Sequence, residues 1–417
     1  MQVTGAENIK SKILRRAGKG AFMQDIYSFL DEQKDYVIEI QKNLVSRIGL
    51  GPENGGQGEA EKAEYVLGCV KDIGVDRVVR MDAPDDRVPG GERPNFAAII
   101  DGQDRSRTFW IISHLDVVPS GDLAMWDSDP FQLRVENDLV FGRGVEDNHQ
   151  AVVSSLLAAK GLRDSGKVPP FNLGLLFVSD EETGNEYGLK YVLDNHASYF
   201  SKDDLFLVPD FGTSDSAMLE VAEKSMLWMK ISVSGVQTHA SRPQNGRNSI
   251  VAAAHIIVQV SRLEAVFDQE DSLFSPPKST FSPTKIEANV PNINTIPGSD
   301  VFYIDCRVLP DYDLNMVVAE IEKLTSEIAE KNGVGVKCEP VHFEQAAPAT
   351  DQNSEIVRRM QKAISEVYEI SPQPQGVGGG TVAVYIRKLG YPAAVWSTLM
   401  HQAHQANERS SISNTIN

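Results

Sequence analysis

Histidine and carboxylate side chains follow directly after apolar runs, and this placement limits the folds open to the chain. His114 comes just after residues 109–112, the pair Glu181-Glu182 just after 173–178, and Asp210 just after 205–209. Segments with helical periodicity, such as 151–162 and 188–194, lie between such runs. Strands that alternate with helices indicate a largely parallel, doubly wound sheet, an α/β fold. In such sheets ligands gather beyond the carboxyl ends of the strands, where these polar residues are expected.

Two more residues complete a set with the chemistry of metal ligands. Asp147 closes residues 142–147, and His404 opens residues 404–408. The full set is His114, Asp147, Glu182, Asp210 and His404. Two imidazoles and three carboxylates suit zinc or a similar divalent ion. If one carboxylate bridged two ions, each ion would keep one imidazole and one terminal carboxylate, and a bridging hydroxide would cancel the remaining charge. The set therefore predicts a hydrolase site.

The neighbours of these candidates predict a division of roles. In a strand, residues two apart share a face, so Asp116 is expected to accept the second N–H of His114 and fix its tautomer. Glu181 and Glu182 are adjacent and project differently. We therefore assign Glu182 as a ligand and Glu181 as the general base acting on water. An isolated acidic pair would more often be an exposed turn.

Composition excludes several classes of protein. The 417 residues include 58 acidic and 40 basic side chains, for a net charge of −18, which disfavours nucleic acid and anionic membranes as partners. No apolar run approaches the roughly 20 residues of a membrane span. The cysteines Cys69, Cys306 and Cys338 are scattered, as expected of reduced thiols. Residues 1–22 form a basic extension without a secretory pattern, so we expect a cytoplasmic protein.

The chain divides into a catalytic domain and an insertion. Residues 24–215 and 341–417 are expected to form the catalytic domain, because the second segment contributes His404. Residues 216–340 contain strands near 228–233, 285–288, 301–308 and 335–339, with helices at 249–263 and 314–331. This β-α-β-β-α-β order resembles a ferredoxin-like domain.

Residues 113–119, Trp126, 129–131 and 142–147 together resemble the co-catalytic zinc amidohydrolases. That family includes aminoacylase, succinyl-diaminopimelate desuccinylase, acetylornithine deacetylase and glutamate-releasing carboxypeptidases. The resemblance implies two zinc ions per subunit, with cobalt or manganese as possible substitutes, bridged by Asp147. It also implies a cis peptide between Asp147 and Asn148. His404 matches the histidine of the family's His-x-x-Asn-Glu segment, whereas the competing His401 lacks that context.

The resemblance extends to the insertion. His239, within residues 235–243, matches a histidine that crosses a dimer interface to stabilise the oxyanion, although a lone histidine is more often structural. Asn294, Arg307, Gly380 and Thr381 match substrate-contacting positions, and Arg307 is suited to hold a substrate carboxylate. We therefore expect a homodimer through residues 216–340 and a small-molecule substrate with a free carboxylate.

Two departures put the shape of the substrate pocket in doubt. The family often has Lys-Gly where this chain has His149-Gln150, and Ser-Asp where it has Val382-Ala383. The predicted activity is hydrolysis of an amide in an N-acyl amino acid, of the desuccinylase or deacetylase type. The alternatives are a dipeptidase or carboxypeptidase of the same family, and a non-catalytic binding protein, which loss of a ligand would favour. An aminopeptidase with a different lid is disfavoured by residues 235–243.

Overall fold

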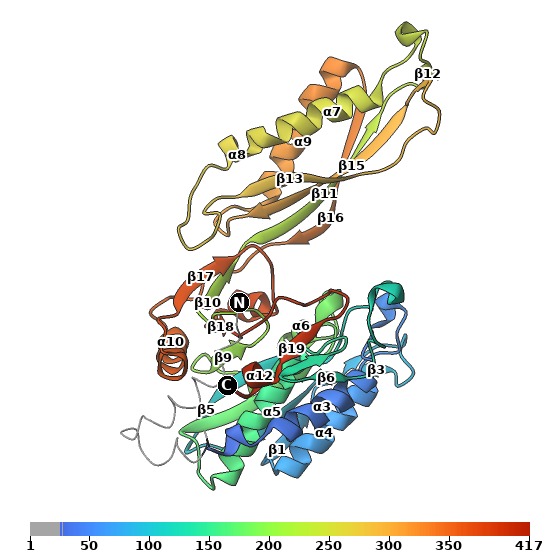
Figure 1. The fold of residues 1–417 in the computed structure, drawn as a ribbon. Coiled ribbons are helices and arrows are strands. Elements are labelled where there is room, and N and C mark those ends of the chain that lie inside the picture. The colour runs from blue at the N-terminus through green and yellow to red at the C-terminus, as the bar shows by residue number, and fades with distance from the viewer. Residues whose placement is uncertain (1–25, 27) are drawn as a thin grey trace. The chain divides into compact units, whose positions relative to one another are not determined.

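The computed structural model describes residue 26 and residues 28–417, so the basic extension 1–22 lies outside the described residues. The chain forms two compact units (Figure 1). The first contains the described residues up to Val221 with Thr350–Pro374 and Thr381–Asn417, and the second contains Ala222–Ala349 with Gln375–Gly380. The insertion had been expected at residues 216–340.

The first unit is built on an eight-stranded sheet with the order β1-β4-β8-β5-β9-β18-β10-β17. Its strands are β1 (Arg77–Arg80), β4 (Phe96–Ile100), β5 (Asp104–His114), β8 (Phe171–Val178), β9 (Leu205–Val208), β10 (Met218–Glu223), β17 (Gln373–Val377) and β18 (Ala393–Val395). The central strands β8, β5, β9 and β18 are parallel. The pairs β1–β4, β4–β8 and β10–β18 are antiparallel. The predicted α/β fold is confirmed, with antiparallel strands on both sides of its parallel centre.

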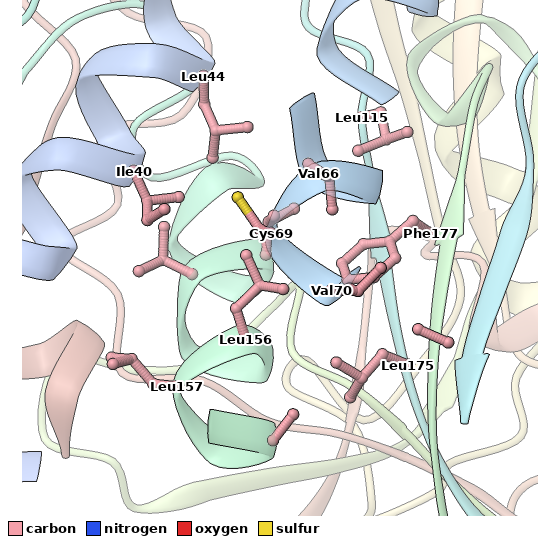
Figure 2. Packing of buried hydrophobic residues seen from close by; sticks show 14 of the residues in the cluster. Ile40, Leu44, Val66, Cys69, Val70, Leu115, Leu156, Leu157, Leu175 and Phe177 are labelled. Atoms are coloured by element: carbon pink, nitrogen blue, oxygen red, sulfur yellow. The ribbon is translucent and has the colours of Figure 1, made fainter. Parts of the chain in front are cut away.

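Helices cover both faces of this sheet, which explains why its strands are continuously apolar. One face packs on α3 (Lys34–Ser46), α4 (Ala60–Ile73) and α5 (His149–Asp164). Figure 2 shows Leu156 of α5 and Val70 of α4 beside Phe177 of β8. The opposite face packs on α6 (Leu189–Asn195) and α11 (Ala383–Lys388). Alternate residues of β4 enter the two cores, as the two-residue period of a strand requires.

Smaller elements complete the first unit. They are α10 (Glu355–Tyr368), α12 (Ile412–Ile416), the three-stranded sheet of β19 (Arg409–Ser411), β7 (Leu139–Phe141) and β6 (Arg134–Glu136), and the pair β2 (Ala83–Pro84) and β3 (Glu92–Arg93). The carboxyl ends of the parallel strands decide where the candidate residues lie. His114 ends β5, Glu181 and Glu182 follow β8, and Asp210 follows β9. These side chains therefore meet at one sheet edge.

The second unit has the expected β-α-β-β-α-β order. Its elements are β11 (Ser225–Ser234), α7 (Ser249–Gln259), α8 (Leu263–Val266), β13 (Thr280–Ile286), β15 (Ser299–Val308), α9 (Leu314–Asn332) and β16 (Gly335–Glu344). The antiparallel sheet order is β13-β15-β11-β16. Its core joins inward residues of β11 to α7 and α9. Two short strands, β12 (Thr238–His239) and β14 (Thr295–Ile296), pair separately.

One helical stretch of the described chain, Ser249–Val266, is long and apolar enough to cross a membrane by length and composition alone. The sequence reading had found no such run. In the structure Ala252, Ala253 and Ile256 of this stretch are buried in the core of the second unit. One face of this stretch therefore packs in the core of the second unit, while Ile250, Val251 and Val258 are exposed.

Candidate metal centre

The five predicted ligands come together at the sheet edge of the first unit. His114 Nε2 lies 3.0 Å from Asp147 Oδ1 and 3.5 Å from Asp210 Oδ1. His404 Nε2 lies 3.3 Å from Asp147 Oδ2 and 3.1 Å from Glu182 Oε1. Asp147 thus presents one carboxylate oxygen to each imidazole. His404, and not His401, makes these contacts in the described residues.

These contacts divide the donors into two sets that share Asp147. One set is His114, Asp147 and Asp210, and the other is Asp147, Glu182 and His404. Donor atoms of His114, Asp147 and Glu182 lie within 4.8 Å of one another, as do those of His114, Glu181 and Asp210. Proximity alone therefore admits Glu181 as a ligand too. The arrangement has the donors to hold divalent ions with Asp147 between them.

Asp116 holds the backbone of Glu181 and Glu182 and lies next to His114. Its buried carboxylate accepts hydrogen bonds from the backbone N–H of Glu181 at 3.0 Å and of Glu182 at 2.9 Å. The Nδ1 atom of His114 lies 3.1 Å from the backbone carbonyl oxygen of Asp116 and 3.4 Å from its carboxylate. The carbonyl is therefore the closer acceptor, whereas the sequence pointed to the carboxylate. Either acceptor leaves Nε2 of His114 directed at Asp147.

The carboxylates of the cluster lie close together, so a positive charge among them would be stabilised. Burial, and then the charge of Asp147, raise the pKa of Glu182 to about 7. Burial, and then the charge of Asp210, raise the pKa of Glu181 well above its usual range. Hydrogen bonds to Asp147 and Glu182 raise the pKa of His404 to about 10.

The pKa of Asp147, the carboxylate between the two donor sets, shifts in the opposite direction. Burial alone would raise the pKa of Asp147, but hydrogen bonds from His114 and His404 lower it below its usual range. Protons on the imidazoles thus balance closely spaced carboxylates. Divalent ions would supply the same charge once those protons leave, so the donor set fits a metal centre.

Two loops that carry ligands hold each other by reciprocal hydrogen bonds, which we call the carboxylate clamp. The carboxylate of Glu408 accepts from the backbone N–H of Gly144, Glu146 and Asp147 at 3.0–3.1 Å and from Arg143 at 2.6 Å. In return, the carboxylate of Glu146 accepts from the backbone N–H of Met400, Gln402 and Ala403. The clamp therefore fixes Asp147 and His404 together.

The peptide bond Asp147–Asn148 is cis, as the resemblance implied. The roles of Glu146 and Glu408 were missed from the sequence. Glu408 is the glutamate of the His-x-x-Asn-Glu segment and Glu146 directly precedes Asp147, but neither pattern indicates these hydrogen bonds.

The remaining candidates occupy the second unit, apart from the buried Thr381. His239 is exposed on β12, and its Nδ1 accepts from Ser241 N–H at 3.1 Å. The backbone N–H of Ala240 donates to the carbonyl of Asn294 at 2.8 Å, so His239 and Asn294 lie on neighbouring segments.

Arg307 already has partners within the second unit. Its Nε and Nη2 atoms donate to Asp305 at 2.7 and 3.0 Å, and Nη1 donates to the carbonyl of Gly378 at 2.8 Å. The guanidinium thus touches the glycine run that contains Gly380. Asp305 already accepts two hydrogen bonds from the guanidinium of Arg307. A substrate carboxylate would therefore have to compete with Asp305 for these donors.

Comparisons with known proteins identify the family and the fold of the chain. The sequence profile described as Peptidase family M20/M25/M40 matches residues 110–417. An uncharacterized metallohydrolase of Methanocaldococcus jannaschii is 39% identical over 393 residues, which span 91% of this chain and 96% of that protein. A succinyl-diaminopimelate desuccinylase of Cereibacter sphaeroides is 26% identical over 327 residues, 78% of this chain and 83% of that protein. The structure of human carnosine dipeptidase 1 shares the fold, with a TM-score of 0.71 at 15% identity over 95% of this chain and 96% of that one.

Proposed function

Because this chain belongs to peptidase family M20/M25/M40 and is a metal-dependent hydrolase of amide or peptide bonds, we propose that it is a dinuclear zinc amidohydrolase. The observation that carries the proposal is Asp147, whose two carboxylate oxygens face His114 and His404 separately. His114, Asp147 and Asp210 would hold one ion, and Asp147, Glu182 and His404 the other. The bound ions would polarise the scissile carbonyl and lower the pKa of water.

The residues around the ions supply proton transfer. Glu181 is half-buried, and its backbone N–H is held by Asp116, so its carboxylate lies beside the proposed ligands. As general base it takes a proton from the attacking water. The new C–O bond forms, the C–N bond breaks, and Glu181 returns the proton to the leaving amine. The products are a carboxylic acid and an amine, which ionise to a carboxylate and an ammonium group when the acid proton passes to the amine.

The second unit would complete the site in a homodimer. We assign His239 as the donor to the developing oxyanion in the partner's site, since an exposed imidazole is free to meet another surface. Asn294, Arg307, Gly380 and Thr381 would contact a small substrate that bears a free carboxylate. The three unpaired cysteines support a reducing, cytoplasmic location.

For the substrate we propose an N-acyl amino acid of the desuccinylase or deacetylase type. The similarity to a desuccinylase over 78% of this chain supports this class. The dipeptidase alternative rests on a shared fold with carnosine dipeptidase 1.

A panel of N-succinyl and N-acetyl amino acids, dipeptides and N-carbamoyl amino acids, assayed with zinc-loaded enzyme, tests the choice. Glu181→Gln protein purified in parallel is the control for contaminating hydrolases. The proposal expects the highest kcat/KM on an N-acyl substrate. A dipeptide that exceeds every acyl substrate would assign the peptidase function instead. Parent protein that is fully metal-loaded yet as slow as the control on all of them would contradict the hydrolase assignment.

A further inference from the structure

A buried lysine contacts the helix that begins just after the bridging ligand. Lys62 belongs to α4 and is 1% exposed, and His149, equally buried, is the first residue of α5. Lys62 Nζ lies 2.8 Å from His149 Nε2. The other ring nitrogen of His149, Nδ1, is buried and has no hydrogen-bond partner among the described residues. Lys62 is therefore the side chain that holds this imidazole.

The imidazole of His149 packs against the loop that carries Asp147. A Cβ atom placed on Gly144 would lie 2.7 Å from Cε1 of His149, so the ring lies directly on the backbone there. The backbone N–H of His149 also donates to the carbonyl of Gly144 at 2.9 Å. A change in ring position would therefore be transmitted to the loop that presents Asp147.

The charge of Lys62 faces carboxylates beneath the metal centre. Burial lowers the pKa of Lys62 to about 8, while attraction to Asp116, Glu59 and Glu408, in that order, opposes the change. Glu59 is paired with Arg93, and Glu408 with Arg143. Among the described residues, Asp116 makes an ion pair only with the imidazole of His114. Attraction to these carboxylates, Asp116 first among them, thus favours the charged form of Lys62.

We propose that Lys62 is a positioning residue for the metal centre: from α4 its buried ammonium group holds the imidazole of His149 against the loop that presents Asp147. Position 149 is where the chain departs from the Lys-Gly of the family it resembles. Because Lys62 Nζ and His149 Nε2 are 2.8 Å apart, substitutions at the two positions are expected to be coupled. This inference rests on the proposed metal function.

Metal affinity tests the role directly. Full-length protein loaded with Co²⁺ or Zn²⁺ is titrated with a competing chelator, and the visible spectrum of the Co²⁺ form is recorded. Lys62→Met should weaken metal retention by roughly 10–100-fold and alter that spectrum, since residues that orient ligands typically act at this level. Lys224→Met is the matched control. Lys224 is also buried, but it donates to the carbonyls of Pro276 and Lys278 in the second unit, so metal retention should stay parental.

An exchange of the two side chains separates positioning from simple packing. Lys62→Met combined with His149→Lys should bring metal retention back to within about threefold of the parent, because the two positions are coupled. His149→Lys alone should weaken retention, since two ammonium groups would then face each other. If Lys62→Met does not fold, the double variant should recover both soluble protein and metal binding.

The outcomes are distinct. Parental metal affinity in Lys62→Met, or a double variant no better than Lys62→Met in folding and metal retention, would overturn the role of Lys62. Failure of the parent itself to bind metal would instead overturn the proposed function.

Discussion

Glu181 and Glu182 are adjacent in the chain, yet their carboxylates meet different partners. Asp116 fixes both backbone N–H groups, while only the carboxylate of Glu182 contacts His404. This difference in partners is consistent with the proposed roles of Glu181 as base and Glu182 as ligand. Substitutions that keep the size of each residue therefore distinguish their roles.

Replacing Glu181 with glutamine should lower kcat by roughly 100-fold or more, because the amide cannot accept the proton from water. Metal content, measured by elemental analysis, should remain parental. Glu182→Gln is the matched comparison, and it should lose metal as well as activity. Activity of Glu181→Gln within a few-fold of the parent would show that Glu181 is not the base.

Two nearby histidines provide a test of metal stoichiometry. His404 contacts Asp147 and Glu182, whereas the ring of His401 stacks near Phe211, with centroids 6.2 Å apart. His404→Ala should therefore reduce saturated zinc content from about two equivalents to about one. His401→Ala should leave it at the parental value. A parent that saturates near one equivalent, unchanged by His404→Ala, would refute the two-ion arrangement.

At the scale of the elements, the carboxylate clamp links the loop before α5 to the loop that carries His404. The carboxylate of Glu146 accepts hydrogen bonds from three backbone N–H groups of residues 400–403. Glu146→Gln should therefore lose part of the hydrogen bonding that holds that loop. We expect a loss of about 1–3 kcal/mol in unfolding free energy and weaker binding of one ion. Thermal unfolding and chelator competition measure the two effects. Glu136→Gln is the control, because Glu136 forms an exposed pair with Arg134; equal effects in both variants would rule out the clamp.

Local patterns in the sequence predicted most of these elements. The apolar run 173–178 lies within β8, and the helix expected at 314–331 is α9. Strand β5 begins at Asp104, earlier than expected, because its first residues are polar and exposed. The pairing of Arg307 with Asp305 could have been predicted from the sequence, since residues two apart in a strand share a face.

Contacts between distant segments could not be predicted in this way. Lys62 and His149 are 87 residues apart, and Glu408 is 264 residues from Gly144. The periodicity of the sequence does not indicate such long-range contacts, because only the tertiary fold brings these groups together. The candidate ligands, and Asp116 beside His114, could be predicted because each follows a recognisable strand or motif, whereas the long-range contacts of Lys62 and Glu408 could not.

At the scale of the whole molecule, His239 belongs to a different compact unit from the metal ligands. The described part of α7 and its surroundings also exposes Ile250, Val251 and Val258, which supports an apolar contact between subunits. We therefore expect His239 to act in the partner's site of a homodimer.

Mixing inactive Glu181→Gln and His239→Ala chains tests this arrangement. After statistical subunit exchange, roughly a quarter of the sites would be intact, and activity should recover accordingly. Each variant mixed with itself is the control. No recovery despite demonstrated exchange would place His239 outside the partner's site.

The carboxylate clamp also has a consequence for how a new chain matures. His114, Asp147, Glu182 and Asp210 are all synthesised before the second unit, whereas His404 and Glu408 come after it. A growing chain therefore presents one imidazole and an excess of negative charge until the distant segment arrives, and such long-range closure is slow. Only a molecule that has completed this closure offers both halves of the metal centre. Under the proposed function, a full complement of metal would therefore mark the copies in which synthesis and folding have finished.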